Sequence, residues 1–205
     1  MANDKIKFST GTVVDEDGYL YQVGTKITAT AAELNAAADV SDQGAIMAPS
    51  TVMAATLESY QSSVVRTGDI IKTTIAIDLT GAKSTATNKD IIGDTGICHI
   101  GQITTAINGI IYKGQVSCGE VPTTGDDDID LYQASVGTGA YNADASGLTN
   151  AAVLMTSGGA YAIGTVKPLT VLPTADYYLY LATGDTTAGT YNAGKILIEL
   201  WGTVA

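Results

Sequence analysis

The chain has few of the residues that build most chemical sites. Among its 205 residues there are two Cys, one His, one Trp and one Phe. Two cysteines are too few for the disulfide framework of a small secreted protein. No run approaches the roughly 18 apolar residues of a membrane span, and residues 1–7 lack the apolar core of a signal peptide. We therefore expect a soluble protein that is made and kept in a cytoplasm and binds no membrane.

Basic residues are scarce as well. The chain has 10 Lys and Arg against 21 Asp and Glu, which gives a formal net charge of -11. A surface of this sign repels nucleic-acid phosphates and anionic lipids, so we expect no nucleic-acid partner. Hydrophobic residues nevertheless make up 45% of the chain. They form short Ile, Val, Leu and Tyr runs, which predict a folded domain and not a disordered acidic tail.

The abundant residues favour β-structure. The chain has 23 Gly, and from residue 64 onward apolar runs alternate with Gly, Thr and Asp turns at intervals of roughly ten residues. One face of the segment 70–79 holds Ile71, Thr73, Ile75, Ile77 and Leu79, as expected of a strand with one wet side. Further strands are predicted at 129–135, 151–155, 160–166, 169–172, 177–181 and 195–204. The predicted fold class is all-β, an antiparallel β-sandwich that is jelly-roll-like.

Two segments predict how the strands pair. The last strand, "KILIELW", is apolar on nearly both faces and is expected in the middle of a sheet or at a subunit contact. Asn108-Gly109 is the preferred two-residue turn of a type I′ hairpin. That turn would place His99 opposite Cys118 and put Cys98 on the other side of the ribbon, so we predict no disulfide.

The N-terminal third differs from the rest. Residues 8–28 predict a small hairpin around "DEDG". Thr30 and Glu33 have the spacing of a capping box, which starts a short helix at 30–38 whose one large apolar side chain is Leu34. Residues 44–63 predict another short helix capped by Ser50. We expect residues 1–62 to form an attachment arm and residues 63–205 to form a sandwich that folds without it.

One segment imitates a phosphate-binding loop. The spacing from Gly189 through Gly194 and Lys195 matches that motif, but its last position is Ile196 where a magnesium ligand, Ser or Thr, is needed. The following residues are typical of a strand, whereas the motif requires a helix. We interpret the segment as a turn.

The single histidine, His99, suggests two hypotheses, a metal site or a catalytic site with a nucleophile. His99, Cys98 and Cys118 offer at most three zinc ligands where a structural site takes four. The chain has no Gly-x-Ser-x-Gly elbow, and any serine enzyme would depend on His99 alone. We therefore interpret His99 as a strand residue and predict no catalytic residue, no cofactor and no metal ligand.

An acidic segment and a group of tyrosines each allow a structural and a functional interpretation. Asp126 to Asp128, with Asp130 and Glu120 nearby, supply the hard oxygen ligands that calcium prefers but lack EF-hand spacing, so we expect a solvated loop. The tyrosines at 177, 178 and 180 could stack on sugars or line a protein contact, and packing in the sandwich or at a subunit interface is the simpler interpretation.

The stretch "GTKITATAAELNAAADVS" resembles a short "ITATAAELN" connector found in virion proteins of tailed bacteriophages. In capsid decoration proteins and in head or tail fibres this connector usually joins an N-terminal hairpin to a β-rich body. The match covers residues 24–41. The body resembles decoration proteins in style only, through short Thr/Gly/Ala strands, "YYLYLATGD" and "GKILIELWG". In place of "AAADVS", many relatives have a Leu-Asp-Gly continuation.

The resemblance implies a capsid decoration (cement) protein. Such a protein would be a homotrimer that binds the major capsid protein on the outer capsid surface, after synthesis in the host cytoplasm, and stabilises the shell. The acidity agrees with a position away from packaged DNA. The alternative is a head or tail fibre or receptor-binding module that recognises a host surface glycan. A hydrolase that depends on His99 is the third class.

Overall fold

The computed structural model describes residues 6–7, 12–14, 20–22, 25–26 and 47–204, which fall in two separate units, 1–41 and 42–205. The first unit holds a four-stranded antiparallel sheet in the order β1-β2-β3-β4. In it Val14 pairs with Leu20, so the strands of the expected hairpin are confirmed. The helix expected at 30–38 lies outside the described residues. The strand bounds are β1 (Ile6–Lys7), β2 (Thr12–Val14), β3 (Leu20–Gln22) and β4 (Thr25–Lys26).

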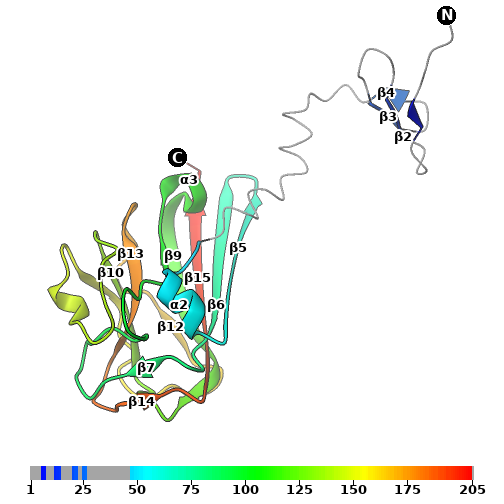
Figure 1. The fold of residues 1–205 in the computed structure, drawn as a ribbon. Helices are drawn as coiled ribbons and strands as arrows, with labels where there is room; N and C mark the ends of the chain where they lie inside the picture. The colour runs from blue at the N-terminus through cyan, green and yellow to red at the C-terminus, as the bar shows by residue number, and fades with distance from the viewer. Residues whose placement is uncertain (1–5, 8–11, 15–19, 23–24, 27–46, 205) are drawn as a thin grey trace, which may run out of the picture. The chain divides into compact units, whose positions relative to one another are not determined.

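The second unit contains two large antiparallel sheets, so the predicted all-β antiparallel sandwich is confirmed (Figure 1). The five-stranded sheet has the order β12-β9-β15-β6-β5 and the four-stranded sheet the order β11-β10-β13-β8. The first comprises β5 (Ser59–Thr67), β6 (Ile70–Asp78), β9 (Ile110–Thr123), β12 (Val166–Pro168) and β15 (Ala193–Thr203). The second comprises β8 (Gly101–Gln102), β10 (Ile129–Ala134), β11 (Ala152–Met155) and β13 (Tyr178–Thr183).

Short elements complete this unit. β7 (Lys83–Ser84) and β14 (Gly189–Thr190) form a two-stranded sheet. The helical segments are α2 (Thr51–Thr56), α3 (Thr105–Asn108) and the 3-10 turn η1 (Ala145–Gly147). Two predicted strands were misplaced: within residues 160–172 the structure has only β12, and Tyr161, buried in the core, is followed by a turn.

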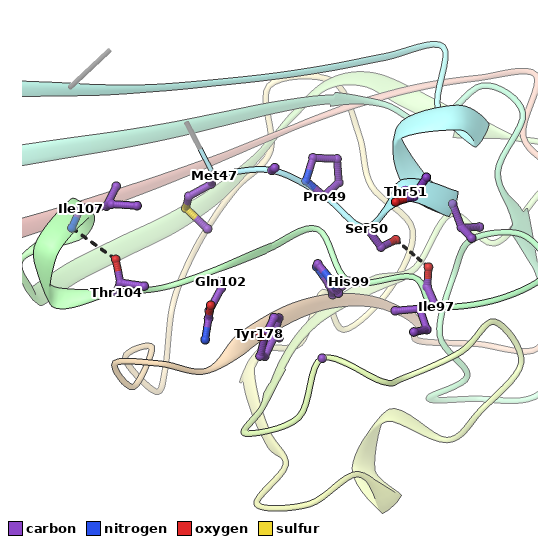
Figure 2. A pocket seen from close by; sticks show the side chains of 13 residues that line it. Met47, Pro49, Ser50, Thr51, Ile97, His99, Gln102, Thr104, Ile107 and Tyr178 are labelled. Carbon is purple, nitrogen blue, oxygen red and sulfur yellow. Dashed lines mark hydrogen bonds between the residues drawn. The ribbon is translucent and has the colours of Figure 1, made fainter. Parts of the chain in front are cut away.

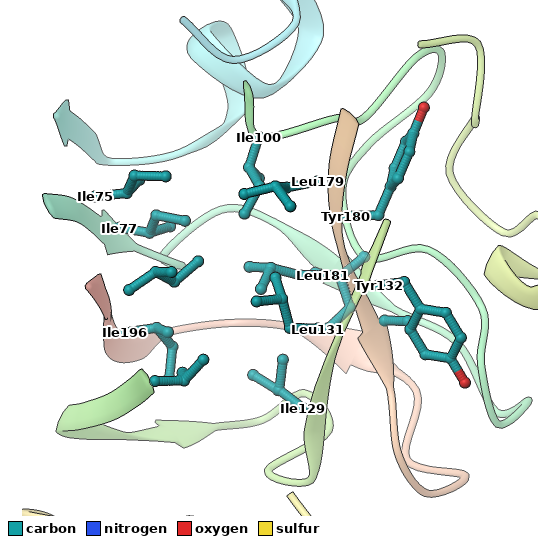
Figure 3. Close-up of a cluster of buried hydrophobic side chains, with 14 of the residues drawn as sticks. Ile75, Ile77, Ile100, Ile129, Leu131, Tyr132, Leu179, Tyr180, Leu181 and Ile196 are labelled. Carbon is teal, nitrogen blue, oxygen red and sulfur yellow. The ribbon is translucent and has the colours of Figure 1, made fainter. Parts of the chain in front are cut away.

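The core lies between the two large sheets. The predicted buried face of residues 71–79 is confirmed, because all five of its residues are buried. Figure 3 shows side chains of the two sheets facing each other, while Tyr132 and Tyr180 point to the far side of the four-stranded sheet. Burial of this apolar surface is the main force that holds the sheets together. The facing residues include Ile75, Ile77, Ile196, Leu131, Leu179 and Leu181.

The last strand occupies the middle of its sheet, as one of its two predicted positions required. β15 pairs along its length with β6 on one side and with β9 on the other. Ile196, Ile198 and Leu200 point into the core. The opposite face of β15 carries Leu197, Glu199 and Trp201, all partly exposed.

The expected hairpin at Asn108-Gly109 is wrong. Residues 105–108 form α3, with the Thr104 hydroxyl accepting from the Ile107 amide, and Gly109 ends the helix at a φ of 68°. The Asn108 side chain is buried and donates to the Thr73 hydroxyl (2.9 Å). β8 consequently pairs with β13 and not with β9. An Asn-Gly pair is common at helix ends as well as in hairpin turns. Here the buried side-chain amide of Asn108, through its bond to Thr73, favours the helix end.

The expected boundary after residue 62 is also too late. The predicted cap is confirmed, because the Ser50 hydroxyl accepts from the Met53 amide (3.2 Å) and α2 follows. Met53 is fully buried in the core and β5 pairs with β6 from Ser59 onward. Residues 47–62 therefore belong to the sandwich unit, because their apolar side chains complete its core.

Candidate functional site

An open pocket of about 670 Å³ lies at one side of the sandwich unit (Figure 2). Three segments form most of it: the approach to α2, the stretch between Ile97 and α3, and the start of β13. This volume is in the range of small-molecule and side-chain binding sites. The lining residues are Met47, Ala48, Pro49, Ser50, Thr51, Val52, Ile97, His99, Gln102, Thr104, Ile107, Gly137 and Tyr178.

An aromatic pair forms part of the pocket wall. The His99 ring packs against Tyr178 with ring centroids 4.9 Å apart, and Tyr180 lies behind it at 6.5 Å. Burial lowers the pKa of His99 below its ordinary value, so the ring is neutral at pH 7. Its Nδ1 atom is buried and has no hydrogen-bond partner among the described residues. His99 lies before β8 and outside every described strand, so its predicted strand position is wrong, and its ring packs against Tyr178 in the pocket wall.

Hydrogen bonds to Ser50 hold two walls of the pocket together. The Ser50 hydroxyl donates to the Ile97 carbonyl (2.5 Å), and the Ser50 amide donates to the His99 carbonyl (2.9 Å). On the opposite side the Gln102 side chain donates to the Asp176 carbonyl (3.0 Å). The pocket shape is thus fixed before any ligand arrives, which reduces the entropy cost of binding.

The lining suits binding better than catalysis. Met47, Pro49, Val52, Ile97 and Ile107 supply apolar surface. The lining contains no carboxylate, lysine or cysteine, and the hydroxyl of Ser50 is already committed to the helix cap. A neutral histidine without an orienting partner is a poor general base. The pocket can receive an apolar side chain or a short apolar segment.

The structure does not assemble the candidate Cys/His group. His99 lines the pocket, but Cys98 is buried and its thiol contacts the Asp94 carbonyl (3.1 Å). Cys118 pairs with Ile196 of β15 and not with His99, which corrects the expected register. Both cysteines are free, and burial raises the pKa of each thiol. Such thiols are weak nucleophiles.

The acidic segment at 126–130 is not the solvated loop that we expected. Asp126 is fully buried, and its carboxylate accepts from the amides of Asp128 (3.0 Å) and Asp185 (3.0 Å). Asp130 is 6% exposed and accepts from the Ser157 amide (2.8 Å). The two carboxylates organise loops through backbone amides. In the described part of the chain no three His, Cys, Asp or Glu residues lie close enough to hold a metal ion.

The phosphate-loop imitation is a turn between strands, as interpreted from the sequence. Its residues form β14, a turn and the start of β15. Tyr191 in its middle is buried, with its hydroxyl donating to the Asp126 carbonyl (2.8 Å). A segment whose centre lies in the core cannot wrap a phosphate.

Comparisons with known proteins add no relative: no family model, no curated protein and no solved structure matches the chain. Within the described ranges, the structure also has no helix that is long and apolar enough to cross a membrane.

Proposed function

We propose that the protein is a structural component of a tailed-bacteriophage virion that decorates and stabilises the outer surface of the capsid. The observation that carries this proposal is the connector at residues 24–41, "GTKITATAAELNAAADVS". Its arrangement between an N-terminal hairpin and an all-β unit agrees with the virion proteins that it resembles. The net charge of -11 is suited to a location outside the DNA-filled shell.

Attachment is assigned to two parts of the chain. Residues 1–41 serve as the arm that binds the major capsid protein. The pocket beside α2 receives an apolar side chain of the same partner, because its walls are fixed and mainly apolar. Ile97, at the rim, is 41% exposed and available for this contact.

The test is cosedimentation with empty capsids. The full chain is expected to pellet with the shells, and a protein lacking residues 1–41 to stay in the supernatant. Ile97→Asp is expected to weaken binding, whereas Ile70→Asp, at an isoleucine of comparable exposure (49%) outside the pocket, serves as the matched control. Undiminished binding by the truncated protein would remove the arm from the proposal. Failure of the full chain to bind any capsid would overturn the function.

Self-association is the second part of the proposal. We expect a homotrimer, in which the apolar side chains exposed beside the edge strand β12 become covered. These are Ile163, Val166, Val171 and Leu172, each at least 41% exposed. Light scattering measures the mass directly, and a monomer at high concentration would contradict the trimer.

Copy number separates decoration from the fibre alternative. A decoration protein occupies many sites on each shell, whereas a head or tail fibre is present in few copies. An image of the intact virion that locates this chain at a tail tip or at isolated spikes would favour the fibre and overturn the decoration proposal.

A further inference from the structure

The outward face of the five-stranded sheet carries the chain's single tryptophan. Trp201 lies on the central strand β15 and is partly exposed. Its cross-strand neighbours are Lys72 on β6 and Lys113 on β9. Directly paired residues share a face of a sheet, so the indole and both lysines lie together on the outer surface.

On the same face, two residues before Trp201 along β15, Glu199 is held by neighbouring polar side chains. Glu199 accepts from the Gln115 amide through Oε2 (2.7 Å) and forms an ion pair with Lys72 through Oε1 (2.7 Å). Lys72 also holds the pKa of Glu199 below its ordinary value. The side chains of Glu199 and Gln115 are therefore positioned before a ligand binds. Each still has unused capacity for hydrogen bonds, because a carboxylate and an amide can make more bonds than these.

The face is locally cationic in an acidic protein. The ammonium groups of Lys72 and Lys113 lie over the indole ring of Trp201, 5.4 and 4.5 Å from its centroid. Lys72 is paired with Glu199, but Lys113 makes no ion pair with any residue that the structure describes. Two ammonium groups and one carboxylate leave a net positive charge here, while the whole chain carries -11. An anion is thus drawn to Lys113 in particular.

We propose that this face, centred on Trp201, binds an acidic saccharide. The apolar C–H face of a pyranose ring takes the place of the Lys113 ammonium over the indole. The sugar hydroxyls bond to Gln115 and Glu199, and its carboxylate pairs with the displaced Lys113 ammonium. A protein partner would have to desolvate the Lys72–Glu199 pair with little to replace its water. A sugar replaces that water with its own hydroxyls. This site is distinct from the pocket beside α2 and does not depend on capsid attachment.

The lone tryptophan makes the test direct. Trp201 fluorescence of the full-length protein is followed during titration with tri-galacturonate, and galactotriose is the uncharged comparison. We expect a saturable change with the acidic sugar, at least about tenfold weaker binding of the neutral one, and loss of that preference at high salt. A change that depends on protein concentration without sugar would assign the face to a second copy and overturn the proposal.

Variants locate the binding, with calorimetry as the readout because Trp201 is altered. Trp201→Ala is expected to weaken tri-galacturonate binding at least about tenfold. The affinity of Trp201→Phe is expected to lie between those of Trp201→Ala and the unaltered protein. Lys113→Met is expected to remove the preference for the charged sugar. Lys167→Met is the matched control, because Lys167 pairs with the buried Val116 and so lies on the other face. Unchanged binding in Trp201→Ala, or equal losses in both lysine variants, would overturn the assignment.

Discussion

Asp130 makes the stability of the sandwich unit depend on pH. Burial, with further contributions from Asp128 and Asp126, raises its pKa to about 6, from an ordinary value of roughly 4. The folded state therefore binds this proton more tightly than the unfolded state. Above pH 6 the buried charge lowers the free energy of unfolding, and that cost disappears as the pH falls from about 6 towards 4.

We predict that Asp130→Asn raises the free energy of unfolding at pH 7 by about 2 kcal/mol, because a neutral amide can still accept from Ser157 without a buried charge. Near pH 4 the advantage over the unaltered protein should vanish. Urea unfolding at both pH values measures this difference. Asp69→Asn, at an exposed turn, is the control. Equal stability of the two proteins at pH 7 would contradict the prediction.

Gly202 stands where β15 passes the end of α3. A Cβ atom at this position would lie 2.0 Å from the Asn108 carbonyl oxygen, which is backbone and cannot move alone. We predict that Gly202→Ala lowers the free energy of unfolding by about 3 kcal/mol. Gly147→Ala, whose Cβ would meet nothing closer than 3.9 Å, should stay within about 0.5 kcal/mol. Thermal unfolding compares them, and similar melting temperatures for the two variants would refute the clash.

Single residues also show which features of the structure can be predicted from the sequence. The alternation around Ile75 and the hydroxyl of Ser50 predicted a strand and a helix cap correctly, because both signals are local. Burial of Asp126 was not predictable in this way. Its amide partner Asp185 lies 59 positions away, and nothing in an acidic run distinguishes a buried carboxylate from a solvated one.

At the scale of elements, α2 joins the pocket to the core. Ser50→Ala removes the helix cap and the bond to the Ile97 carbonyl, so we predict a loss of about 1–2 kcal/mol of unfolding free energy. Chemical denaturation is the measurement, with Thr51→Ala at the adjacent exposed position as the control. A loss of equal size at Thr51 would show that the cap contributes nothing specific.

The pocket could not be predicted from the chain because no single element contains it. Its walls come from residues 47–52, from 97–107, and from Gly137 and Tyr178. The error at Asn108-Gly109 had a related cause. A dipeptide rule favoured a hairpin, but the Asn108 side chain reaches Thr73 on β6, and only the assembled sheet supplies that partner.

At the scale of the whole molecule, the unit boundary predicts which truncations fold. A protein of residues 42–205 keeps α2, β5 and all core residues of the sandwich unit, so its melting temperature should match that of the same unit in the full chain. A protein of residues 61–205 loses buried Met53 and Leu57 and should be destabilised by several kcal/mol or fail to fold. Circular dichroism melts decide, and a stable fold in the shorter protein would contradict the boundary.

The central position of β15 in the sheet has a consequence for folding during synthesis. The β5–β6 hairpin and the β9–β12 pair emerge from the ribosome early, yet the five-stranded sheet joins them only through β15, residues 193–203. Until that strand is synthesised, β6 and β9 each present an unpaired edge to neighbouring chains. Completion of the sheet therefore waits for β15, and nascent chains are exposed to mispairing from the emergence of β6 until that strand has emerged.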